Sequence, residues 1–88
     1  MSKIKLAGTE SALPTSGAGA TTFNRAPGVR LVNTGATATV TVLESVGGEE
    51  IGTFTILTNS TEHLAKGNEH AVYATGGTVL GTPVGFVG

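Results

Sequence analysis

The chain has 88 residues, no cysteine, five basic residues and a formal net charge of −1. This length predicts one domain with a thin core, and the lack of cysteine removes disulfides and thiolate zinc ligands as sources of stability. The scattered basic residues argue against a nucleic-acid partner, because neutralising phosphates requires clustered lysine and arginine. No run approaches the roughly 20 apolar residues of a membrane span, and the first residues do not lead into the apolar stretch of a secretion signal.

The start of the chain has the composition of an extended arm. Residues 8–24 are rich in Gly, Ala, Ser and Thr, and they contain Pro14 and no sustained periodicity. Such a segment buries too little apolar surface to offset its ordering entropy, so it is either a floppy terminus or an arm that a partner orders. The run Lys3–Leu6 is a candidate edge strand on this protein's own sheet or on a neighbour's. We therefore predict an extended N-terminal arm over residues 1–25 and a β-domain over residues 26–88.

Short β-branched runs alternate with turns through the rest of the chain. The runs at 29–33, 37–43 and 53–57 have the two-residue period that places alternate side chains on opposite faces of a sheet. Residues 33–36 are predicted to form a hairpin turn between the first two runs, with Gly35 free to take positive φ. Further turns are predicted at residues 46–50, 58–59, 66–68 and 75–77. This spacing predicts an all-β fold, a small antiparallel β-sandwich or barrel of about six to eight short strands.

The same alternation predicts which side chains form the core. The predicted core residues are Val29, Leu31, Val40, Val42, Phe54, Ile56, Leu64, Val72, Val84 and Phe86. Val72 and Tyr73 could exchange places, because a one-residue slip in register turns the inside of a strand outward. No apolar stripe with helical period extends beyond one turn, so no helix of useful length is expected.

Threonines form a second pattern on two neighbouring runs. Thr37, Thr39 and Thr41 share one face of their strand, and Thr53 and Thr55 share a face of the next. If these strands pair, their hydroxyls form an exposed polar face. Such a face occurs on glycan-binding and ice-binding sheets, and it is also typical of an ordinary solvated sheet.

No pattern in the sequence is typical of a catalytic or metal site. His63 and His70, each preceded by a glutamate, have no further ligands at metal-binding spacing. The serines lie outside a nucleophile-elbow motif, and Glu49 and Glu50 diverge from an exposed glycine turn. The sequence therefore predicts a protein that is not an enzyme and that uses no cofactor or metal, one whose surface carries its function.

Two short segments are the most distinctive in the predicted β-domain: Val-Arg-Leu-Val-Asn-Thr at 29–34 and Thr-Pro-Val-Gly-Phe at 82–86. Together with the runs at 39–42, 51–56 and 62–67, they resemble a family of very small virion proteins of tailed phages, especially those of cyanobacteria and other marine bacteria. The resemblance covers about residues 29–86 and does not extend to the predicted arm.

This resemblance implies a structural role on the virion, as a capsid decoration (cement) protein or as a tail, neck or fibre-associated component. It implies the major capsid protein or other virion proteins as partners, a homo-oligomer, commonly a trimer, and a place on the capsid surface after assembly in the host cytoplasm. A host-surface or glycan-binding module that uses the threonine face and Tyr73 is the alternative from another class.

An extended arm fits such a role, because it can add a strand to an open sheet edge on a neighbour. The predicted partner contacts are Ile4, Leu6, Leu13, Phe23 and Tyr73. Deletion of residues 1–24 is accordingly expected to leave the sheet intact and to weaken incorporation into particles.

Overall fold

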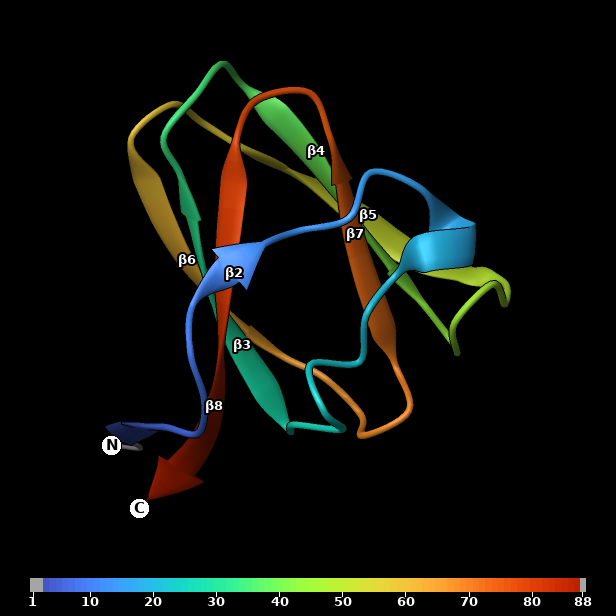
Figure 1. Ribbon diagram of the computed structural model, residues 1–88, viewed down its shortest axis with the longest axis vertical. Coiled ribbons are helices and arrows are strands. Elements are labelled where there is room, and N and C mark those ends of the chain that lie inside the picture. The colour runs from blue at the N-terminus through green and yellow to red at the C-terminus, as the bar shows by residue number, and fades with distance from the viewer. Residues whose placement is uncertain (1–2, 88) are drawn as a thin grey trace.

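The computed structural model describes residues 3–87, with side chains over residues 5–85, as two antiparallel sheets packed against each other (Figure 1). The strands are β1 (Lys3–Leu6), β2 (Ser11–Ala12), β3 (Gly28–Asn33), β4 (Ala38–Leu43), β5 (Glu50–Ile56), β6 (Ser60–Ala65), β7 (Ala71–Thr75) and β8 (Val79–Val87). A short 3-10 helix, η1 (Gly17–Gly19), lies between β2 and β3. The all-β prediction is confirmed, and the fold is a small β-sandwich.

The chain crosses repeatedly between the two sheets, and from β5 to β8 successive strands alternate between them. One sheet has the order β1-β8-β3-β6, with β2 also paired to β8, and the other has the order β5-β4-β7. Among the described strands from β3 onward, only β4 and β5 are joined as a hairpin within one sheet. The predicted hairpin at residues 33–36 is therefore wrong, because β3 pairs with β6 and β8 while β4 pairs with β5 and β7.

A single buried amide explains why residues 33–36 cross between the sheets. The side chain of Asn33 is fully buried. Its Oδ1 accepts hydrogen bonds from the N–H of Gly35 at 3.0 Å and the N–H of Thr78 at 3.2 Å. Its Nδ2 donates to the carbonyls of Ala36 at 2.7 Å and Ile56 at 3.1 Å. Asn33 thus ties the β3–β4 connection to the end of β5 and to the start of β8.

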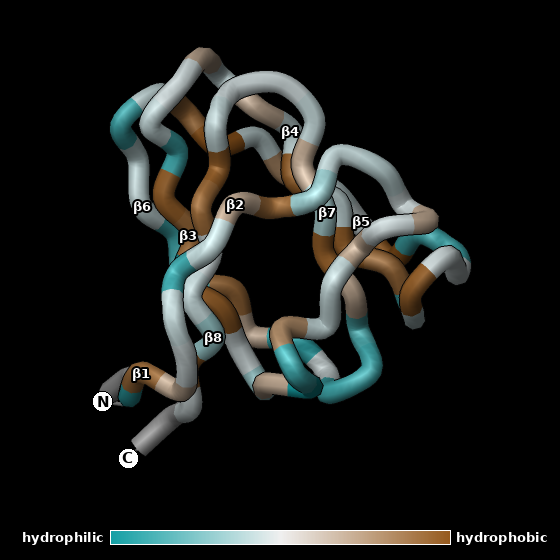
Figure 2. Tube along the Cα trace, viewed as in Figure 1, coloured by the Kyte–Doolittle hydropathy of each residue, from teal (hydrophilic) through white to brown (hydrophobic). Residues whose placement is uncertain are grey.

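The core lies between the sheets and follows the predicted alternation closely. Hydrophobic residues concentrate on the strands and hydrophilic residues in the connections (Figure 2). The predicted core residues that are fully or almost fully buried are Val29, Leu31, Val40, Ile56, Val72 and Val84. Those that are only partly buried are Val42, Phe54 and Leu64, and the side chain of Phe86 lies outside the described residues. Val72, and not Tyr73, points inward.

The segment predicted to be an extended arm packs onto the body. Residues 3–26, hereafter the N-terminal segment, run along β8 and then across to β7, and so cover one open side of the sandwich (Figure 1). Leu13 and Phe23 are buried in the main core. They fit because β8 carries Gly81, where an added Cβ would lie 2.5 Å from Phe23 Cζ and 2.8 Å from Leu13 Cδ1. The composition of residues 8–24 does not predict this packing, because the packing depends on two large apolar side chains among many small and polar ones.

No helix among residues 3–87 is long and apolar enough to cross a membrane.

Candidate functional site

A groove lies along the side of the sandwich opposite the N-terminal segment, between β5 and β6. These two strands are the outer strands of their sheets, and each pairs on one side only within the described residues. The groove between them opens to solvent and has a volume of about 610 Å³. Because the free edges present unpaired backbone N–H and C=O groups, the groove is bounded by two strands that can each accept another strand.

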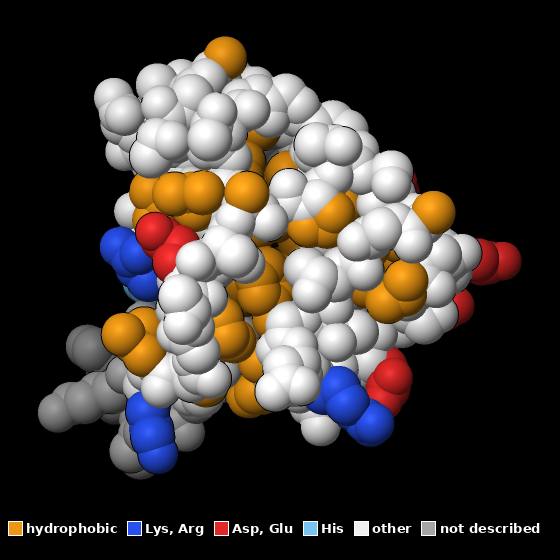
Figure 3. Space-filling model, viewed as in Figure 1, with side chains coloured by type: hydrophobic (Ala, Val, Ile, Leu, Met, Phe, Trp, Pro, Cys, Tyr) orange, Lys and Arg blue, Asp and Glu red, His pale blue; other side chains and the backbone are white. Residues whose placement is uncertain are grey.

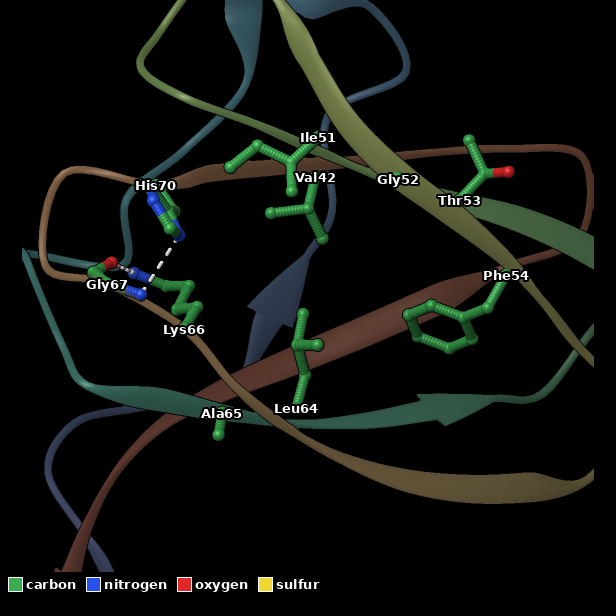
Figure 4. A pocket seen from close by; sticks show the side chains of 10 residues that line it. All are labelled: Val42, Ile51, Gly52, Thr53, Phe54, Leu64, Ala65, Lys66, Gly67 and His70. Carbon is green, nitrogen blue, oxygen red and sulfur yellow. Dashed lines mark hydrogen bonds between the residues drawn. The ribbon is translucent and has the colours of Figure 1, made fainter.

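The walls of the groove are apolar. Val42 and Leu64 point toward each other across it, and Phe54 closes one end (Figure 4). Val42 is open to the groove because its partner on β5 is Gly52, which has no side chain to cover it. The register shifts just beyond this pair, and Ile51, in the irregular stretch, lies on the rim with 52% of its surface exposed. A glycine and a bulge in an edge strand therefore create the groove.

His70 and Gly67 shape the opposite end of the groove (Figure 4). The N–H of Gly67 donates a hydrogen bond to His70 Nδ1 at 3.0 Å. The imidazole lies directly over Gly67, where an added Cβ would approach the ring atoms to 3.0–3.2 Å. Since Nδ1 accepts this bond, the neutral imidazole carries its hydrogen on Nε2. Any side chain at position 67 would displace the ring.

Lys66 connects the groove to the N-terminal segment. Its Nζ donates hydrogen bonds to the carbonyls of Thr22 and Ala26, both at 2.8 Å, and to that of Gly67 at 3.3 Å. Burial lowers the pKa of the Lys66 ammonium, and the carboxylate of Glu69 acts in the opposite direction. Among the described residues that line the groove, the ionisable side chains are Lys66 and His70, and no carboxylate is present. The groove therefore suits a bound segment that has apolar side chains and carries no positive charge.

Replacing Lys66 with methionine is expected to lower the free energy of unfolding by about 1–2 kcal/mol, because carbonyls of the N-terminal segment lose a charged donor while the apolar stem is kept. Urea denaturation measures the change. The Lys5→Met substitution, at an exposed position, is the matched control and is expected to change stability by less than about 0.5 kcal/mol. Equal stability of the two variants would contradict the role of Lys66.

The residues predicted to contact a partner lie in different environments in the structure. Leu13 and Phe23, two of the predicted partner contacts, are buried in the core of this chain and are not open to a partner in this conformation. Tyr73 is half-buried against a small second cluster of Ala20, Leu43 and Ala71. Leu6 is exposed, and the side chain of Ile4 lies outside the described residues. The four whose side chains the structure describes do not form one surface patch. The groove between β5 and β6 was not predicted, although Gly52 inside a β-branched run was a signal of an open position.

The threonines pair as the sequence predicted. Thr39 lies opposite Thr55 and Thr41 opposite Thr53 in the β4–β5 hairpin. Thr41 is nevertheless buried, and it lies opposite Tyr73 on the other neighbouring strand. The polar face is therefore narrower than predicted, and its tyrosine is packed against the protein instead of standing free as a platform for a sugar ring.

The two histidines do not meet. His63 is exposed on β6, opposite Arg30 of β3, whereas His70 lies at the groove end. The part of the chain that the structure describes contains no group of three or more His, Cys, Asp or Glu side chains placed to hold a metal ion. On the face crossed by the N-terminal segment, charged side chains lie toward the periphery and apolar ones between the strands (Figure 3).

The fold and the groove define a small all-β protein with an open, apolar groove between two edge strands. No protein-family model, curated protein or solved structure matches the chain.

Proposed function

We propose that this protein is a non-enzymatic structural protein of a virion, a capsid decoration (cement) protein that clamps neighbouring capsid subunits. The sequence resemblance to small virion proteins of tailed phages supports this role. The observation that carries it is the groove, where two free strand edges face each other across apolar walls. A groove of this kind suits an extended chain better than a reacting small molecule, because backbone groups on its edges can pair with another strand and its lining is mostly apolar.

The groove suits an extended segment of a capsid subunit. Such a segment would pair through its backbone with β5 or β6, while alternate side chains enter between Val42, Phe54 and Leu64. The basic lining favours a segment without lysine or arginine near Lys66 and His70. Many copies bound side by side on a symmetric shell would add their contacts, so each single contact need only be modest.

Replacing Ile51 with glutamate tests the groove without touching the core. A charge on the rim is expected to weaken binding to purified heads that lack this protein by at least about tenfold, because apolar contact is lost and a charge is desolvated. Val46→Glu is the matched control, since Val46 is also 52% exposed but lies in the β4–β5 turn outside the groove. Circular dichroism checks that both variants fold.

Binding of Ile51→Glu at the wild-type level would exclude the groove as the contact. Counting copies on purified particles tests the location separately. Hundreds of copies on the head shell support decoration, whereas a single ring of about six or twelve copies at the portal would support a tail or neck protein instead.

A further inference from the structure

The N-terminal segment is bound to the rest of the protein by contacts that any identical copy could also make. β1 and β2 pair with β8, and Thr21 forms a bridge with Val72. Pro14 accepts a hydrogen bond from the N–H of Ala74 at 3.0 Å. These contacts join the segment to the sheets, not to itself. They would be unchanged if the segment came from a second molecule.

A strained loop joins this segment to β3. Phe23, Asn24 and Arg25 have φ values of 54°, 57° and 62°, three consecutive non-glycine residues in the left-handed region. Side chains of L-residues disfavour this conformation, and it persists only where surrounding contacts hold it. The threonine hydroxyls of residues 21 and 22 accept from the N–H groups of Phe23 and Arg25, and Lys66 binds the carbonyls on either side. Straightening residues 23–27, hereafter the hinge loop, would release this strain.

We propose that the N-terminal segment is exchanged between copies of this chain, with the hinge loop extended and the segment seated on β8 and β7 of a second copy. Short hinge loops under strain favour such exchange, because the exchanged form keeps the pairing of the segment with β8 and β7 and loses both the strain and the hydrogen bonds within the closed loop. Five extended residues span about 17 Å, which is enough to reach a body packed alongside. The proposal does not depend on a virion role or on the groove.

A disulfide across the segment and β8 traps the segment on whichever molecule holds it. Ala12 lies opposite Leu80. The N–H of Leu13 donates to the carbonyl of Val79 at 2.9 Å, which places the 12–80 pair at a position without ladder hydrogen bonds, where side chains approach closely. The chain has no other cysteine. Within one chain, the Ala12→Cys/Leu80→Cys variant can therefore form this disulfide only, and between chains the 12–80 pairing is distinguished from 12–12 and 80–80 by peptide mass.

The experiment mixes ¹⁴N- and ¹⁵N-labelled double variants, unfolds and refolds them in reductant over a range of concentrations, and then oxidises them. Exchange predicts 12–80 disulfides that join one light and one heavy chain, in a fraction that rises with the concentration during refolding. A Val46→Cys variant, with its thiol on an exposed turn, measures random cross-linking. Disulfides within single chains only, at every concentration, would overturn the proposal.

Substitutions at Asn24 are expected to shift the equilibrium between the closed monomer and the exchanged dimer in opposite directions. Proline cannot adopt positive φ and also disfavours the present conformation of Phe23, so Asn24→Pro is expected to raise the dimer fraction at least about tenfold in size-exclusion chromatography with light scattering. Asn24→Gly relieves the strain of the closed loop and is expected to lower the dimer fraction. A folded Asn24→Pro variant that stays monomeric would contradict exchange, and if this variant does not fold, the disulfide experiment decides.

Discussion

Replacing Asn33 with alanine is expected to lower the free energy of unfolding by about 3–4 kcal/mol, a large part of the stability of a domain of this size. The substitution removes the partner of two N–H groups, on Gly35 and Thr78, and of two carbonyls, on Ala36 and Ile56. Each buried group left without a hydrogen bond costs about 1–3 kcal/mol, less whatever small shifts and entering water recover. Urea denaturation at neutral pH measures the loss.

Two further variants separate the hydrogen-bonding role from the mere presence of a side chain. Asn33→Asp keeps the shape but places a carboxylate oxygen against the carbonyls of Ala36 and Ile56. This contact raises the pKa of the aspartate in the folded state, so the variant is expected to gain stability as the pH falls and protonation restores a donor. Asn68→Ala, at an exposed loop position, is the control and should stay within about 0.5 kcal/mol of wild type. An Asn33→Ala variant that also stays within this range would refute the network.

Asn33 also shows which features of the fold local sequence patterns can predict and which they cannot. The two-residue period identified the strands and most of the core, because the face that a side chain occupies is set within its own strand. The threonine pairs were predictable for a similar reason, since β4 and β5 are neighbours in sequence and form a hairpin. The partners of β3 were not, because the bond from Asn33 to Thr78 joins residues 45 apart and leaves no local signature.

The groove and the N-terminal segment were missed for a different reason. An open edge is a property of the assembled sheets, and it can be located only when the outer strands are known. Gly52 and Gly81 both interrupt β-branched runs, yet one opens a groove to solvent and the other receives Phe23 and Leu13. The sequence shows that a side chain is absent at each glycine, but not what fills the space.

Replacing Phe23 with alanine is expected to destabilise the protein by about 3–5 kcal/mol, as large truncations in a close-packed core do. The residue lies in the segment whose composition indicated an arm, but its ring is buried over Gly81. Deletion of residues 1–24 would remove this ring together with Leu13 and β2. We therefore expect that deletion to unfold the protein instead of leaving an intact sheet, and loss of the β-sheet signal in circular dichroism would show it.

A double-mutant cycle between Phe23 and Gly81 tests whether the two positions share one packing site. Gly81→Ala alone is expected to cost about 1–3 kcal/mol, because its Cβ would overlap the ring. In the Phe23→Ala background the same Cβ no longer meets the ring and retains only its close contact with Leu13 Cδ1. The double variant should therefore lose less stability than the two single variants lose together, by about 1 kcal/mol or more. Additive effects would mean that the ring does not occupy the space above Gly81. A positive coupling would place the N-terminal segment within the cooperative core, whichever copy of the chain supplies it.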